Sequence, residues 1–135
     1  MKKWVLLALL LGCPDRAPKG AELRVPLPDG WVATGSTERL VANPRGRGVV
    51  TFESKSEVLP ALRGLVTTLE AQGSTDLEPT EEGEFRGVRY TVEREPAFVA
   101  VKTVGARTIW CASMLGASTA EVSASFETCH AIELR

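Results

Sequence analysis

The sequence predicts an α+β domain in which a mainly antiparallel β-sheet carries two principal helices. β-rich runs follow one another through short turns over residues 23–54 and again over residues 75–115. Strands connected in this way pair in antiparallel fashion. Two other stretches, residues 56–73 and 118–135, change to helical spacing. Helices packed on an antiparallel sheet define the α+β class.

The predicted domain opens with extended structure. Apolar residues alternate with prolines over residues 23–28, and Asp29-Gly30 supplies a turn. Two β-rich runs, residues 38–42 and 48–54, then flank an Asn-Pro-Arg-Gly sequence. Because this composition is typical of a turn between paired strands, we predict that the two runs form a hairpin.

The first helix is predicted over residues 56–73. Ser56 is a suitable N-cap, Pro60 fits the first turn, and Gly73 is a natural C-terminal stop. Apolar residues recur three or four positions apart, which is the spacing of one helix face. This stripe, which we expect to pack on the core of the domain, consists of Val58, Leu62, Leu65, Val66 and Leu69.

Strands return at Thr75, with a turn predicted at Glu82-Gly83. The strand after this turn has one apolar and one polar face, because every second residue is apolar. Two further runs, residues 97–105 and 107–115, meet at a Gly-Ala pair that indicates another hairpin. Both runs are apolar on each face, as expected for central strands that are covered on both sides.

The second helix is predicted near the end of the sequence. Ser118 and Glu121 match a capping box, in which each side chain satisfies the backbone N–H of the other residue. Val122, Phe126 and Cys129 follow at i, i+4 and i+7, so they share one helix face.

The N-terminus has the layout of a secretory signal peptide. Lys2 and Lys3 form a positive region, Trp4–Leu11 is apolar, and the small residue Gly12 precedes Cys13. A membrane-spanning helix needs about 20 apolar residues, so this run is too short to cross a bilayer. We therefore expect a cleaved leader rather than a membrane span.

Leu10-Leu11-Gly12-Cys13 resembles the lipobox of bacterial lipoproteins. The resemblance implies cleavage between Gly12 and Cys13 and lipidation of Cys13, which becomes the new N-terminus. Acyl chains contribute about 0.8 kcal/mol for each buried methylene, and more than one chain gives stable anchoring. The alternative is an ordinary secretory leader that is followed by a structural cysteine.

These observations divide the chain into three parts. Residues 1–12 are the predicted leader, residues 13–22 a lipidated tether rich in proline, glycine and charge, and residues 23–135 a single domain. The predicted location is the cell envelope, where lipid on Cys13 anchors the chain to a bacterial membrane facing the periplasm or the exterior.

The order of elements resembles the PsbP-like fold over Leu23–Leu134. Its cues are the opening sequence "RVPLPDGW", the helix in mid-chain, and a closing helix after a long antiparallel run. The resemblance implies roles in binding and assembly rather than one shared chemistry. It carries over no functional residue.

Two cysteines remain for the folded domain. An envelope location permits disulfides, and lipid on Cys13 leaves Cys111 and Cys129 as a pair. We therefore predict a disulfide between them. The alternative is a metal or redox site that uses the two cysteines with His130. No Cys-x-x-Cys motif is present, and His130 is the only histidine available to such a site.

Charge and motifs argue against several function classes. The 16 basic and 17 acidic residues are interspersed and give a formal net charge of −1, without the basic stripe that binds nucleic acid. No nucleophile elbow is present. Gly46-Arg47-Gly48 lacks the lysine and helix of a phosphate loop, and residues 78–84 lack the ligand spacing of a calcium loop. We expect no enzymatic activity, cofactor or metal.

The leading functional hypothesis is a non-catalytic envelope lipoprotein that binds a protein partner or assists assembly. One alternative is a carrier with a small-ligand pocket between sheet and helix, which Trp31 and Trp110 would line. Packing in the core is the competing interpretation of both tryptophans. A further alternative is an inhibitor or immunity-type lipoprotein.

Overall fold

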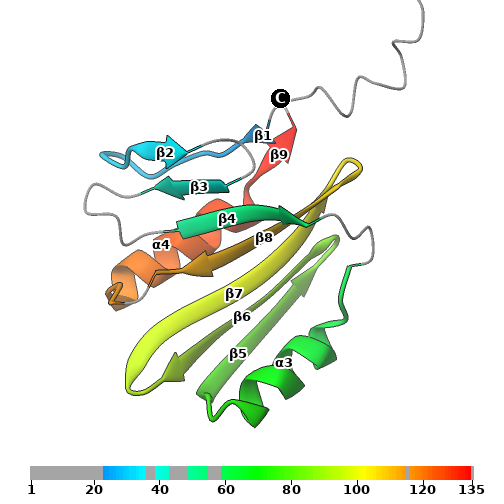
Figure 1. Ribbon diagram of the computed structural model, residues 1–135, viewed down its shortest axis with the longest axis vertical. Helices are drawn as coiled ribbons and strands as arrows, with labels where there is room; N and C mark the ends of the chain where they lie inside the picture. The colour runs from blue at the N-terminus through cyan, green and yellow to red at the C-terminus, as the bar shows by residue number, and fades with distance from the viewer. Residues whose placement is uncertain (1–22, 36–38, 43–48, 55–58, 115, 135) are drawn as a thin grey trace, which may run out of the picture.

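The computed structural model describes residues 23–35, 39–42, 49–54, 59–114 and 116–134, and within this part of the chain it has the predicted α+β class (Figure 1). The predicted leader and tether, with Gly12 and Cys13, lie outside the described residues. The elements in chain order are β1 (Leu23–Arg24), β2 (Ala33–Gly35), β3 (Arg39–Ala42), β4 (Val49–Ser54), α3 (Leu62–Ala71), β5 (Thr75–Glu82), β6 (Phe85–Val92), β7 (Glu95–Val104), β8 (Arg107–Ser113), α4 (Thr119–His130) and β9 (Glu133–Leu134).

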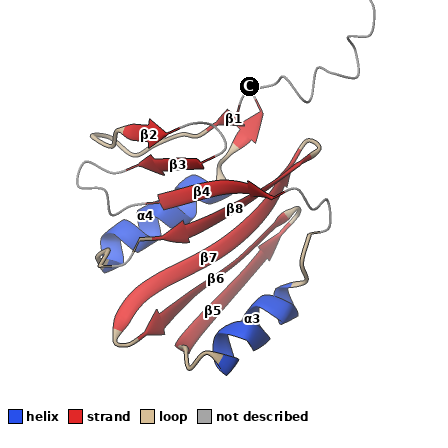
Figure 2. Ribbon diagram, viewed as in Figure 1, coloured by secondary structure: helices blue, strands red, loops and turns tan. Residues whose placement is uncertain are grey.

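Most described strands form one antiparallel sheet. Its order is β2-β3-β4-β8-β7-β6-β5, and every neighbouring pair is antiparallel (Figure 2). β8 pairs with β4 although the two strands are far apart in the sequence. This pairing joins the C-terminal meander β5–β8 and the N-terminal strands β2–β4 into one sheet. A separate two-stranded ribbon pairs β1 with β9 and joins the two ends of the described chain.

The meander β5–β8 is made of three hairpins with two-residue turns. Glu82 pairs with Phe85, so the first turn is Gly83-Glu84, one residue later than predicted. The Gly105-Ala106 turn is confirmed between β7 and β8. In both turns the glycine has a positive φ, a conformation that glycine adopts without a steric penalty.

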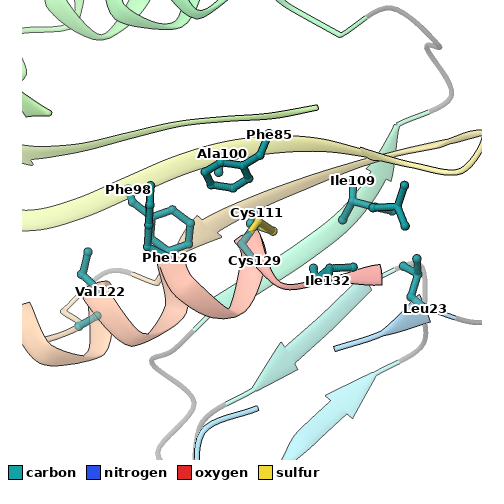
Figure 3. Packing of buried hydrophobic residues seen from close by; sticks show 12 residues of the cluster. Leu23, Phe85, Phe98, Ala100, Ile109, Cys111, Val122, Phe126, Cys129 and Ile132 are labelled. Atoms are coloured by element: carbon teal, nitrogen blue, oxygen red, sulfur yellow. A yellow bond between two sulfur atoms is a disulfide. The ribbon is translucent and has the colours of Figure 1, made fainter. Parts of the chain in front are cut away.

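The two helices cover opposite faces of the sheet. α4 packs over β7, β8 and β4, whereas α3 packs over β5 and β6. The first core cluster joins α4 to one face of the sheet (Figure 3) and consists of Leu23, Phe85, Phe98, Ala100, Val104, Ile109, Cys111, Ala117, Val122, Phe126, Cys129 and Ile132. The second lies on the α3 face, where the buried residues are Leu65, Leu69, Val88 and Val101. The prediction that β7 and β8 are covered on both sides holds only in part, because α4 covers both strands but α3 lies over β5 and β6. On the α3 face Val101 is buried, whereas Val99 and Trp110 are only partly buried.

The helix ends follow local sequence signals, except at the start of α3. The Ser118–Glu121 capping box is present at α4. Gly73 ends α3 with a φ of +87°, as predicted. The predicted start of α3 is wrong: Ser56 lies outside the described residues, and Pro60 precedes a helix that begins at Leu62. Pro60 disfavours helical geometry in Leu59 before it, and Ala61 after it is the extended N-cap, so the helix begins only at Leu62.

Candidate functional site

The candidate site is an apolar groove between α3 and the sheet. It has a volume of about 510 Å³, which falls within the range of small-molecule sites. Residues of α3, β6, β7 and β8, together with the turn before α3, form its walls. The residues that line the groove are Pro60, Gly64, Leu65, Thr68, Leu69, Gln72, Tyr90, Val99 and Trp110.

One wall of the groove runs along the helix. Gly64, Thr68 and Gln72 are four residues apart, so they form one row on the surface of α3, and Pro60 continues this row beyond the start of the helix. Gly64 provides no side chain, and a Cβ built at this position would meet nothing within 4 Å. At Gly64 no side chain of this row projects into the groove, so space remains open beside the helix.

The opposite wall comes from the sheet. Tyr90 of β6, Val99 of β7 and Trp110 of β8 belong to the partly buried residues that surround the second core cluster. The register pairs Trp110 with Val101 and Val99 with Ala112, which brings these residues to one area of the α3 face. Because α3 lies over β5 and β6, the side chains from β7 and β8 extend this face beyond the helix.

Tyr90 is the one ionisable residue that lines the groove. Burial raises the pKa of its phenol, because the charged phenolate loses solvation in an apolar environment. The phenol is therefore neutral at physiological pH and can donate or accept a hydrogen bond.

The lining of the groove combines apolar residues with a few neutral polar ones. Its apolar residues offer aromatic and aliphatic contact area, while Thr68, Gln72 and Tyr90 offer neutral hydrogen-bonding groups. No Asp, Glu, Lys, Arg, His or Cys lines it, so this described site lacks the usual general bases and metal ligands.

The two tryptophans named from the sequence occupy different places. Trp110 lines the groove, as the ligand-carrier alternative requires. Trp31 does not: it packs against the first core cluster, on the α4 side of the sheet. The part of the hypothesis that placed Trp31 in the pocket is therefore wrong. Its neighbours in the chain, Val25 and Leu27, pack against the same cluster.

Cys111 and Cys129 are joined by a disulfide, the bond predicted from the sequence. The S–S distance is 2.04 Å and the Cα–Cα distance is 6.2 Å. Cys111 belongs to β8 and Cys129 to α4, so the bond connects the last helix to the sheet. Both residues are fully buried in the first core cluster. This environment is typical of a structural disulfide rather than a reactive one.

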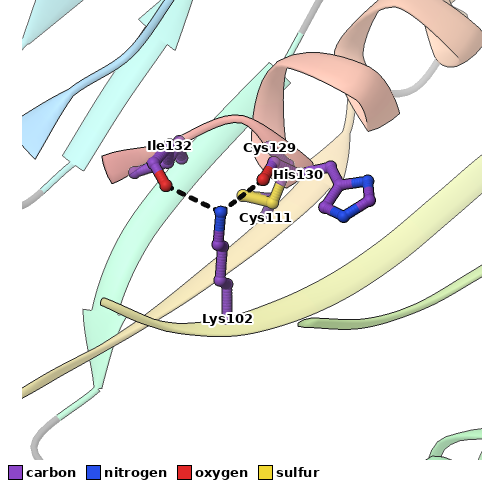
Figure 4. The surroundings of a disulfide bond; sticks show 5 residues. All are labelled: Lys102, Cys111, Cys129, His130 and Ile132. Carbon is purple, nitrogen blue, oxygen red and sulfur yellow. Dashed lines mark hydrogen bonds between the residues drawn. A yellow bond between two sulfur atoms is a disulfide. The ribbon is translucent and has the colours of Figure 1, made fainter. Parts of the chain in front are cut away.

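His130 points away from the disulfide (Figure 4). Its ring stacks on Phe85, with the ring centroids 4.2 Å apart, and its Nε2 lies 2.7 Å from a carboxylate oxygen of Glu82. The alternative metal or redox site would have combined this imidazole with the two thiols. The contacts of His130 instead connect the end of α4 to the β5–β6 hairpin.

Lys102 satisfies backbone carbonyls at the end of α4. Its ammonium donates hydrogen bonds to the carbonyl oxygens of His130 and Ile132 (Figure 4). Such carbonyls have no partner within the helix, and a lysine near a helix C-terminus interacts favourably with them. Burial lowers the pKa of Lys102, and the negative charge of Glu133 opposes this shift.

The remaining predictions about sites concern residues outside the described part of the chain. Cys13, the predicted lipidation site, and Gly12, at the predicted cleavage site, belong to this group. Within the described residues no helix is long and apolar enough to cross a membrane. No group of three or more His, Cys, Asp or Glu residues in that same part is arranged to hold a metal ion.

Comparison with known proteins gives no relative: the chain matches no protein-family model, no curated protein and no solved structure.

Proposed function

We propose that this chain is a lipid-anchored protein of the bacterial cell envelope whose α+β domain binds a small apolar ligand and performs no catalysis. The groove beside α3 is the observation that carries the binding role. Its volume, its aromatic and aliphatic lining, and its few neutral polar groups match the general properties of ligand sites. The groove favours the ligand-carrier alternative over the leading sequence-based hypothesis.

The anchor is supported by the number of cysteines. The chain has three, and the disulfide uses Cys111 and Cys129. Cys13 therefore has no partner within the chain, and it is the residue that follows the signal-like segment and completes the lipobox resemblance. In an exported protein an odd cysteine would be left without a disulfide partner, and lipidation accounts for this third cysteine.

The PsbP-like resemblance belongs to the same proposal. An antiparallel sheet with one helix inserted before its C-terminal meander and another after it supports the resemblance. The implied roles in binding and assembly are compatible with a non-catalytic groove. They also retain a protein partner as a second candidate, favoured by Val32, a large apolar residue that is 61% exposed. Crosslinking and co-purification from solubilised membranes would test that candidate.

The anchor can be tested by metabolic labelling with a palmitate analogue in a bacterial host. We expect the wild-type chain to incorporate label and to fractionate with membranes, because lipid is attached to the Cys13 sulfur. The Cys13→Ala variant should lose both properties. Cys129→Ala serves as the control, since it removes a cysteine that the proposal does not lipidate. Equal labelling of wild type and Cys13→Ala would contradict the proposed anchor.

A further inference from the structure

The groove is elongated along α3. Gly64 and Gln72 are eight residues apart in the sequence, and at 1.5 Å per residue they are separated by about 12 Å along the helix axis. Pro60 extends this wall beyond the helix. Side chains from three adjacent strands form the opposite wall, so a long, thin occupant lying along α3 in this open groove would contact both walls.

The charge of the lining limits the chemistry of that occupant. None of the nine lining residues is Asp, Glu, Lys, Arg or His. An ionised group placed there would lose its hydration without gaining a partner of opposite charge, which is strongly unfavourable. The part of the ligand inside the groove is therefore uncharged and mainly apolar, and any charged end stays in water.

The shape of the groove favours a thin occupant. A helix about 10 Å across would meet the groove with one face only, whereas an extended hydrocarbon chain can contact both walls along its length. A methylene group occupies about the same 30 Å³ as a water molecule in the liquid, so 510 Å³ has room for about fifteen carbons in a chain. One acyl chain fits this space, whereas the two chains of a phospholipid do not.

Gly64 is an exposed residue on the helix wall of the groove. A glycine within a helix is less favourable than alanine, yet neither backbone conformation nor packing requires one here. Gly64 is not among the residues with a positive φ, and a Cβ would meet nothing within 4 Å. The consequence of having glycine at this position is that the channel stays open.

We propose that the groove binds the hydrocarbon chain of a single-chain lipid, with the head group in solvent at one end of α3. This inference deepens the proposed function and rests on its binding role. The chain would lie between the Gly64–Gln72 row and the aromatic faces of Tyr90 and Trp110, where each buried methylene strengthens binding.

The test uses the fluorescence of Trp110. In the chain from Pro14 onward with Trp31→Phe, Trp110 is the one remaining tryptophan, and all described core residues are retained. We expect saturable changes in its emission with tetradecanoate and with uncharged monotetradecanoylglycerol below their micelle concentrations. The two Kd values should agree within a few fold, because no lining charge distinguishes the head groups. Hexanoate should bind at least tenfold more weakly, and phospholipid vesicles should not compete.

Substitutions at Gly64 test whether the lipid binds in the groove. Gly64→Leu fills the groove and should weaken tetradecanoate binding at least tenfold, with Gly64→Ala intermediate. Thr67→Leu adds similar bulk at an exposed position that does not line the groove, and should leave Kd within twofold of the parent. Circular dichroism and thermal unfolding check that each variant is folded.

Three results would overturn the inference: no saturable response to either lipid, equal affinity in folded Gly64→Leu, or protection of Trp110 by a protein partner but not by lipid. The Cys13 labelling experiment is independent of all three. If the chain is labelled at Cys13 but binds no lipid, the proposed anchor stands and the proposed ligand is wrong. If it binds lipid but is not labelled at Cys13, the proposed ligand stands and the proposed anchor is wrong.

Discussion

Tyr90 is the single residue at which the chemistry of the groove can be measured directly. It is the only tyrosine in the chain, so the ultraviolet absorbance of phenolate reports on it alone. It also lines the groove, and burial disfavours its ionised form. The phenolate absorbance of the chain therefore reports on a side chain that lines the candidate site.

We predict that Tyr90 titrates above the ordinary tyrosine pKa of about 10, because burial raises the pKa of its phenol. Between the unfolded and the folded pKa, the folded protein binds more protons than the unfolded chain. The contribution of Tyr90 to the free energy of unfolding therefore falls as the pH rises through this window. Absorbance at about 295 nm in native buffer and in urea would compare the two states.

Tyr90→Phe is the control for this pH dependence. The variant should lose less stability than wild type as the pH rises above about 10, the ordinary tyrosine pKa, when urea unfolding is followed by fluorescence. Identical titration midpoints for native and urea-unfolded wild type would contradict the burial of the phenol.

At the scale of elements, the packing of α4 on the sheet depends on Gly87 in β6. A Cβ at this position would lie 2.8 Å from Cε2 of Phe126 and 3.1 Å from the Cβ of Ala100. Both neighbours are buried in the first core cluster, so neither can move without disturbing it. The glycine therefore permits a close approach between helix and strand, a common role of glycine inside a sheet.

We predict that Gly87→Ala lowers the free energy of unfolding by about 1–3 kcal/mol, the usual cost of overpacking a core. Urea unfolding would measure the change. Gly64→Ala is the matched control: it also adds one methyl group, but into open space on a helix, so it should stabilise the protein slightly. A destabilisation by Gly64→Ala as large as that by Gly87→Ala would contradict this account.

The β6–β7 hairpin shows why some connections were harder to predict than others. Its two turn residues, Glu93 and Arg94, have φ values of +51° and +68°. Hairpins of this length prefer Asn-Gly or Asp-Gly, and here the local sequence contains neither. The long pairing of β6 with β7 holds the turn in this conformation, so its geometry comes from the sheet rather than from its own residues.

At the scale of the whole molecule, the disulfide connects the last helix to the centre of the sheet. Cys111 is in β8, where it pairs with Thr51 of β4, and Cys129 is near the end of α4. The nearby β1–β9 ribbon then joins the C-terminal strand to the start of the described domain. The bond therefore restrains the helix that carries one side of the first core cluster.

We predict that the Cys111→Ala/Cys129→Ala variant loses about 3 kcal/mol of stability, because the bond closes a loop of 18 residues that the unfolded chain would otherwise explore. Urea unfolding of this variant and of wild type would measure the difference. Alkylation without reductant, followed by mass spectrometry, provides the check on pairing: two freely alkylated thiols at these positions in wild type would contradict the disulfide.

The sequence by itself determined the features that arise from local chemistry. The capping box at Ser118, the stop at Gly73 and the Gly105-Ala106 turn depend on neighbouring residues, so short patterns were sufficient to predict them. The number of cysteines likewise pointed to the Cys111–Cys129 bond, because lipid on Cys13 leaves only these two to pair. The apolar stripe of α3 indicated a buried face, although it could not indicate which part of the sheet that face covers.

Tertiary structure alone decided where the groove lies. Trp110 and Trp31 were both candidates for a pocket in the sequence, yet the fold places Trp110 in the groove and Trp31 against the opposite core cluster. Gly64 and Gly87 likewise appear as isolated glycines within regular elements. One faces open space and the other faces Phe126. These differences depend on contacts between residues distant in the sequence, which no local pattern encodes.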